Sequence, residues 1–133
     1  MENQMKEKKL TGYPSIDKPW LKYYSEEAIN APLPKCTIYE YIYNRNQDNL
    51  SRAAMNYYGS DTTYGQMFEQ ISRMAGTLEA EGVKEGDVVT VCMINAPETV
   101  CLLFALNKIG AVANMVYGAS TPEELKKYIT NVK

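Results

Sequence analysis

The pattern of apolar and polar residues is clearest between positions 86 and 118, where two apolar runs flank a helix-like segment. The first run, 88–94, follows a Gly-Asp turn and is rich in β-branched residues, which is typical of a strand buried on both faces. The second run, 112–117, has the same character. The order strand, helix, strand with short joints predicts a parallel βαβ unit with a right-handed crossover, and therefore an α/β fold.

The start of the helix inside this unit carries a capping signal. Asn95 is a residue type that favours the N-cap position, Pro97 suits the first turn, and Glu98 lies three positions after the expected cap. We expect the helix to run to Ile109 and to end at Gly110, because glycine readily takes the left-handed conformation of a helix end. The segment is apolar on nearly every side, which predicts cover from more than one sheet.

Further helices and a small β-hairpin are predicted around this unit. A strand over 51–59 with a short return at 62–63 predicts the hairpin, and 63–82 is the most clearly amphipathic helical segment, whose stripe of methionine and aromatic residues is expected to be core. Two more helices are expected over 37–46 and from position 121 onwards. These three helices share a capping-box pattern, in which threonine is followed by Glu or Gln three residues later: Thr37 and Glu40, Thr63 and Gln66, Thr121 and Glu124.

Two segments are predicted along the chain. Residues 1–35 hold four of the six prolines and no sustained period, which predicts an extended N-terminal arm. We expect its aromatic patch, Trp20 to Tyr24, to pin the arm to a hydrophobic groove. Residues 36–133 are predicted to form an incomplete α/β subdomain, because a parallel sheet normally returns each helix to a strand and the last helix here has none. We therefore expect the sequence to be a truncated part of a larger domain.

Composition narrows the function classes. With 133 residues, 45% of them hydrophobic and 23% charged, the chain resembles an average globular domain and not a disordered one. A net charge of −2 without a basic cluster argues against nucleic-acid binding. No apolar run reaches the length of a membrane span, and the N-terminus lacks the apolar core of a signal peptide. The three cysteines form no Cys-x-x-Cys pair, so reduced structural cysteines in a cytoplasmic protein are expected.

The residues themselves indicate no active site. The absence of histidine excludes Ser-His-Asp and Cys-His hydrolase mechanisms and histidine-ligated zinc. The turn after the first strand has no glycine-rich phosphate loop, Pro97 removes one amide there, and Glu98 would repel an anion. The two pairs of adjacent glutamates fall at predicted helix starts, where carboxylates favour the helix dipole. The sequence therefore predicts no catalytic, cofactor-binding or metal-binding residue.

Five short motifs nevertheless occur in a fixed order over residues ~60–133. They are Thr63-Tyr64, Gly82-Val83-x-x-Gly86-Asp87-x-Val89, Asn95-x-Pro97-Glu98, Lys108-x-Gly110-Ala111-Val112 and Thr121-Pro122-Glu123-Glu124-Leu125. Each is weak alone, but together and at this spacing they are specific. On these motifs the chain resembles the start of the AMP-forming acyl-CoA synthetases and of the wider adenylate-forming enzyme superfamily. The arm around Pro19-Trp20 is similar to the leader of bacterial acyl-CoA synthetases.

The resemblance implies a two-step ligase as the parent enzyme. A carboxylate attacks the α-phosphate of ATP to give an acyl-adenylate and pyrophosphate, and a thiol such as coenzyme A then displaces AMP. It implies ATP, Mg²⁺ and CoA as cofactors of the parent, and as partners the rest of the N-terminal domain, a C-terminal lid domain and a carboxylic acid. The family's working motifs lie beyond position 133, so no residue of this chain inherits a role and the chain alone is expected to be inactive.

The resemblance is incomplete, and alternatives stay open. Met115 and Tyr117 stand where the family commonly has proline and asparagine, and Gly118 replaces a frequent proline, which puts the acid specificity in doubt. The start of an amino-acid-adenylating domain is a second interpretation. A free-standing, non-catalytic α/β interaction module is a third, and a stable monomer without an exposed apolar patch would favour it. A large uncovered sheet edge with self-association would favour the truncated enzyme.

Overall fold

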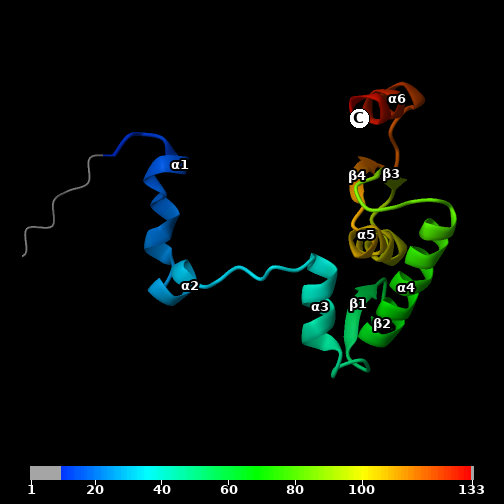
Figure 1. Cartoon of the computed structure of the whole chain (residues 1–133), viewed down its shortest axis with the longest axis horizontal. Coiled ribbons are helices and arrows are strands. Elements are labelled where there is room, and N and C mark those ends of the chain that lie inside the picture. The colour runs from blue at the N-terminus through cyan, green and yellow to red at the C-terminus, as the bar shows by residue number, and fades with distance from the viewer. Residues whose placement is uncertain (1–9, 133) are drawn as a thin grey trace, which may run out of the picture. The chain divides into compact units, whose positions relative to one another are not determined.

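The computed structural model describes residues 10–132, and its contacts divide the chain into two units, with the boundary along the sequence between Pro34 and Lys35 (Figure 1). The first unit contains the short helices α1 (Pro14–Asp17) and α2 (Glu26–Asn30), with the 3-10 helix η1 (Pro19–Tyr23) between them. The second unit contains all other elements.

The N-terminal segment differs from the extended arm that the sequence predicts, because residues 14–30 are largely helical. Pro14 and Pro19 occupy first-turn positions, where a fixed φ favours a helix and the missing N–H is not needed. Ser25 caps α2 by accepting a hydrogen bond from the amide of Ala28. None of these three short helices has a buried residue. Two of the four prolines that predicted an extended chain, Pro14 and Pro19, thus start helical turns.

The second unit follows the predicted element order. Its helices and strands are α3 (Ile38–Asn46), β1 (Ala53–Tyr57), β2 (Ser60–Thr63), α4 (Tyr64–Ala80), β3 (Val88–Met93), α5 (Pro97–Ile109), β4 (Val112–Tyr117) and α6 (Pro122–Asn131). The three predicted capping boxes, at the starts of α3, α4 and α6, are confirmed. Each capping box gives hydrogen-bond partners to backbone amides that would otherwise have none at the start of its helix. The local sequence alone therefore defines where these helices begin.

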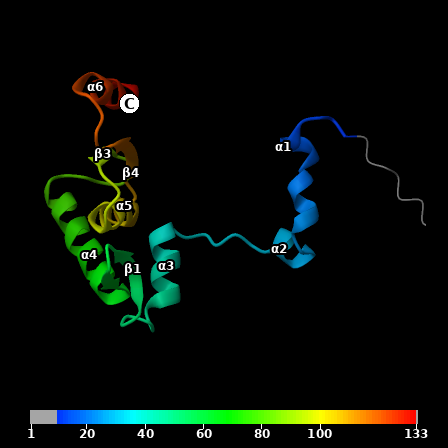
Figure 2. The same cartoon turned by 180° about the vertical axis from the view of Figure 1, so that it is seen from behind.

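The βαβ unit has the predicted parallel pairing. Strands β3 and β4 run in register from Val88 opposite Val112 to Met93 opposite Tyr117. Gly110 ends α5 with a φ of 85°, which is the left-handed conformation expected of that glycine. Figures 1 and 2 show α5 and α6 on opposite sides of this small sheet, so its two faces are approached by helices. The mixed α/β architecture predicted from the sequence is confirmed.

The predicted β-hairpin is also present. Strands β1 and β2 pair antiparallel, and Tyr57 lies opposite Ser60 across a two-residue turn. Tyr58 and Gly59 both have positive φ, at 49° and 84°, as a type I′ turn requires. Glycine takes this conformation at little energetic cost, whereas tyrosine rarely does.

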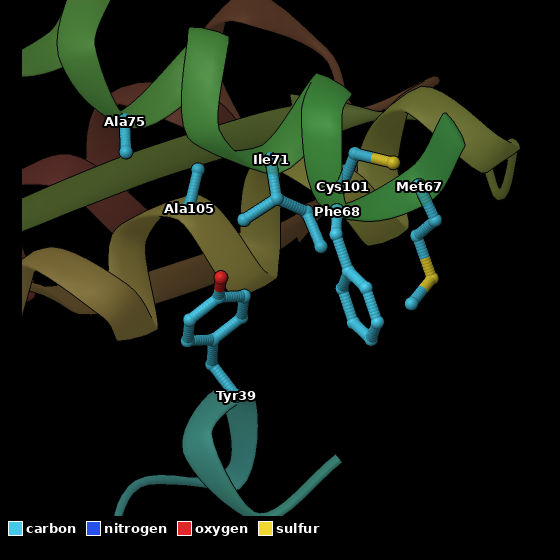
Figure 3. Close-up of a cluster of buried hydrophobic side chains, with 7 residues drawn as sticks. All are labelled: Tyr39, Met67, Phe68, Ile71, Ala75, Cys101 and Ala105. Carbon is cyan, nitrogen blue, oxygen red and sulfur yellow. The ribbon is translucent and has the colours of Figure 1, made fainter. Parts of the chain in front are cut away.

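The hydrophobic core lies between α3, α4 and α5 (Figure 3). The methionine and aromatic stripe of α4 faces it, as the sequence predicts. Tyr39 of α3 packs edge-to-face on Phe68 with ring centroids 6.3 Å apart. The backbone amide of Tyr39 donates to Oδ1 of Asn107, 2.8 Å away, so the end of α5 also satisfies the start of α3. The buried residues of this cluster are Tyr39, Met67, Phe68, Ile71, Ala75, Cys101 and Ala105.

No helix within residues 10–132 is long and apolar enough to cross a lipid bilayer.

Candidate functional site

A hollow of about 460 Å³ lies between the hairpin strand β1, the start of α5 and strand β4. These elements are far apart in the sequence, and the βαβ unit brings the last two together. Residues lining the hollow are Met55, Asn56, Tyr57, Asn95, Ala96, Pro97, Thr99, Val100, Leu103 and Met115. None of these residues was predicted from the sequence to line a site. Two features of the sequence pointed to the hollow: α5 is apolar on nearly every side, and Met115 departs from the residue that the family commonly has there.

The start of α5 forms one wall of the hollow and is built differently from the expectation. The structure corrects the predicted cap, because Ala96 and not Asn95 occupies the N-cap position, and no side chain caps the helix. Thr99 instead turns back along the chain, and its hydroxyl donates a 2.6 Å hydrogen bond to the carbonyl of Ile94. Thr99 is only 5% exposed, so this bond satisfies a buried hydroxyl.

The same helix start is poorly suited to hold a phosphate. Pro97 sits in the first turn and has no N–H to donate, and Glu98 places a carboxylate in that turn. An anion would meet fewer amides and a like charge at this position. The absence of a phosphate site at this turn stays a prediction, which Pro97 and Glu98 support.

The side chains that line the hollow offer mainly apolar contacts. Its lining residues include no carboxylate, amine, thiol or imidazole. Of its two amides, that of Asn56 donates to Oδ1 of Asp61 and accepts from the amide of Gly59, so it stabilises the hairpin. The side chains of Val100 and Leu103 present their apolar groups there and are 37% and 36% exposed. The hollow can therefore hold an apolar group.

The buried cysteine, Cys101, is not a reactive thiol. All three thiols are free. Cys101 is fully buried, and its Sγ lies 3.5 Å from Oε1 of Gln70. Burial, and to a lesser degree the nearby Glu98 carboxylate, raises the pKa of this thiol above its ordinary value. A raised pKa disfavours the thiolate, which is the reactive form. Among the residues that the structure describes, no cluster of three or more His, Cys, Asp or Glu side chains could hold a metal ion.

Comparison with known proteins places this geometry in a family. The family model of the AMP-binding enzymes matches residues 43–133, which include the hairpin, the βαβ unit and α6. An acetyl-coenzyme A synthetase of Allorhizobium ampelinum is 43% identical over 63 residues, covering 47% of this chain and 10% of that protein. The acetyl-coenzyme A synthetase of Shewanella halifaxensis is 33% identical over 85 residues, covering 59% of this chain and 13% of that protein.

Solved structures show the same arrangement. The N-terminal subdomain of NpsA from Klebsiella oxytoca, in complex with anthranilyl-AMSN, superposes with a TM-score of 0.68 at 25% identity, covering 71% of this chain and 25% of that one. MatB from Rhodopseudomonas palustris superposes with a TM-score of 0.59 at 27% identity, covering 62% of this chain and 17% of that one. The chain spans only about a tenth of the curated relatives' length. Since the family model matches well over half of the sequence, the chain belongs to the AMP-binding enzyme family.

Proposed function

We propose that this chain forms the first part of the N-terminal domain of an AMP-forming acid–thiol ligase. The observation that carries the proposal is the family match over residues 43–133, because it includes the β1–β2 hairpin, the β3–α5–β4 unit and α6 in a single alignment. In the reaction that this membership implies, a carboxylate attacks the α-phosphate of ATP and releases pyrophosphate. A thiol such as coenzyme A then displaces AMP from the acyl-adenylate to give a thioester.

The hollow and the start of α5 do not fit ATP and Mg²⁺. The hollow offers no carboxylate to a cation. The start of α5 combines Pro97 with Glu98, which disfavours a phosphate group. A phosphoryl-transfer site works through charged groups and metal ions held around the transferred phosphate. No catalytic step is therefore assigned to this chain, and the chain alone has no adenylation activity in this proposal.

The role of the chain is then structural. Its apolar hollow and the outer side of α5 are covered by the remainder of the N-terminal domain, and a C-terminal lid domain supplies further contacts. The half-exposed apolar side chains of Val100, Leu103 and Met115 support this role, because apolar side chains gathered in one hollow are typical of a surface that packs against another element. The cytoplasmic location stays a prediction from the sequence.

The acceptor of the acyl group has two candidates. Identity to acetyl-coenzyme A synthetases, 43% over 63 residues in one case, favours a CoA ligase. The likeness to NpsA-ThdA of Klebsiella oxytoca, an artificially fused adenylation–PCP di-domain of a peptide synthetase, has a TM-score of 0.68 at 25% identity and supports a carrier protein as the second candidate. The higher sequence identity makes the CoA ligase the leading proposal.

ATP–pyrophosphate exchange tests the proposal. The 133-residue chain is assayed with Mg²⁺ and a panel of short-chain, aromatic and amino acids, and we expect no exchange above the blank. The same assay on the chain continued by its downstream coding sequence is expected to show acid-dependent exchange, followed by thioester formation with CoA. Exchange by the 133-residue chain would refute its inactivity. An active continued protein that loads only a carrier protein would select the second candidate.

A further inference from the structure

Helix α3 (Ile38–Asn46) is held to the rest of the second unit by few side chains. Tyr39 is its only buried residue, whereas Ile38, Tyr41 and Tyr43 are 64%, 39% and 38% exposed. Its main neighbour among the helices and strands is α5. Isolated helices shorter than about 12–15 residues are only marginally stable in water, and α3 has nine. Helix α3 therefore depends on its contact with α5 to stay helical.

Two side chains at the end of α5, Asn107 and Lys108, hold Tyr39 in place. Oδ1 of Asn107 accepts a 2.8 Å hydrogen bond from the amide of Tyr39, in the first turn of α3, where amides have no partner within the helix. The ammonium group of Lys108 lies 5.3 Å from the centre of the Tyr39 ring, within the range of a cation–π contact. It also donates to Oγ of Ser72 on α4, 2.9 Å away. These two side chains, the latch, thus join α3 to both α5 and α4.

The ring of Tyr39 points away from α3 towards α4 and α5 (Figure 3). It meets the ring of Phe68 edge-on, with the centroids 6.3 Å apart. Tyr43, one turn further along α3, meets the same ring with the centroids 5.0 Å apart. Because both tyrosines share one partner on α4, both contacts are lost together when α3 moves away.

The two ends of α3 are attached differently. After the helix, the chain is fixed to the start of α4, because the amide of Gly65 donates to the carbonyl of Leu50 at 2.9 Å and that of Tyr64 to the carbonyl of Arg52 at 3.0 Å. Before the helix, residues 31–36 are all exposed. A segment that is fixed at one end, exposed at the other and buried at one side chain between them can open while its surroundings stay folded.

We propose that α3 is a strap, which the latch of Asn107 and Lys108 holds closed and which opens over residues 37–46 while α4, α5 and both sheets stay folded. Because α3 is the first element after the boundary between the two units, opening lengthens the tether of the first unit from about 1.5 Å to about 3.4 Å per residue. The proposal gives Lys108, which belongs to one of the five family motifs, a role in holding α3. It does not depend on the ligase function.

Amide hydrogen exchange of the 133-residue chain, followed over a urea series below the unfolding transition, tests the strap. We expect the amides of residues 41–46 to be protected at least about tenfold less than those of Ile71 in α4 and Ala105 in α5. Their exchange should also depend less on urea, because opening of the strap exposes less surface than global unfolding does. Equal protection and equal urea dependence in the three helices would mean that α3 opens only when the whole unit unfolds, and would overturn the proposal.

Two matched substitutions test the latch. Asn107→Ala removes the acceptor of the Tyr39 amide and should accelerate exchange in α3 about tenfold, while the amides of α4 keep their rates. Asn114→Ala is the control, because this amide group bonds to Thr90 on β3 and to the carbonyl of Tyr128 on α6. We expect the control to leave exchange in α3 unchanged. An Asn107→Ala variant that leaves α3 unchanged, or accelerates α3 and α4 equally, would contradict the latch, as would equal acceleration of α3 by the control.

Discussion

Gly118 follows the end of β4 and approaches the backbone of β3 more closely than a side chain allows. A Cβ atom at this position would lie 2.6 Å from the carbonyl carbon of Met93 and 2.7 Å from the amide nitrogen of Ile94. Neither atom is the end of a flexible side chain, so relief requires movement of a strand. We expect Gly118→Ala to lower the free energy of unfolding by about 1–3 kcal/mol, measured by urea denaturation. The departure from the family pattern at this position thus has a steric reason.

Gly76 provides the matched control for that substitution. It lies inside α4, and a Cβ there would meet no atom within 4 Å. Alanine in an open helical position is favoured over glycine by about 1 kcal/mol, so Gly76→Ala should raise the free energy of unfolding. If the two alanine variants shift stability in the same direction, the close contact at Gly118 is not what determines its effect.

The buried Cys101 thiol makes stability depend on pH. Its pKa is raised in the folded chain, mainly by burial, so the unfolded chain loses this proton at a lower pH than the folded chain does. The stability that the protonated Cys101 thiol gives the folded chain is complete below the unfolded pKa of about 8.5. It is lost as the pH rises through the pKa of the folded chain. We expect the free energy of unfolding to fall between neutral and alkaline pH, and to fall less in Cys101→Ala. Equal slopes in the two proteins would show that Cys101 is not the titrating group.

At the scale of elements, the start of α5 differs between the helix cap that the local sequence suggests and the hydrogen bond that forms in the structure. Asn95 is exposed and makes no cap bond, whereas the buried hydroxyl of Thr99 bonds to the carbonyl of Ile94 at 2.6 Å. We expect Thr99→Val to cost about 1–2 kcal/mol in the free energy of unfolding and Asn95→Ala less than about 0.5 kcal/mol. If Asn95→Ala lowers the free energy of unfolding more than this in the same urea titration, Asn95 does cap the helix as the sequence predicted.

Elements were predictable where the signal lies within a few residues. The side chains of Thr63 and Gln66 each bond to the other residue's backbone, and Gly110 ends α5 because it takes a positive φ. The local sequence is therefore enough to predict the start of α4 and the end of α5. The cap of α5 was predicted wrongly because Asn95 is a favoured N-cap residue type, whereas the N-cap position falls one residue later, on Ala96. The helical turns at Pro14 and Pro19 were missed because proline favours both an extended chain and the first turn of a helix.

At the scale of the whole molecule, the α/β class and the parallel pairing of β3 with β4 were predictable from the apolar runs, and the hollow was not. Its walls come from Met55 on the hairpin and from α5 and Met115, which are separated by tens of residues in the sequence. Which side chains meet there depends on how the hairpin packs against α5. No short-range pattern carries that information, whereas the ordered family motifs carry the membership.

The most direct measurement of the central claim is to read the coding sequence immediately downstream of the codon for Lys133. The claim is that this chain is the non-catalytic first part of an AMP-forming ligase. It predicts that the reading frame continues through a further strand into a Ser/Thr/Gly-rich loop that ends in lysine, the family's phosphate-binding segment. A stop codon directly after Lys133 would contradict the claim and leave a free-standing interaction module as the account of this chain.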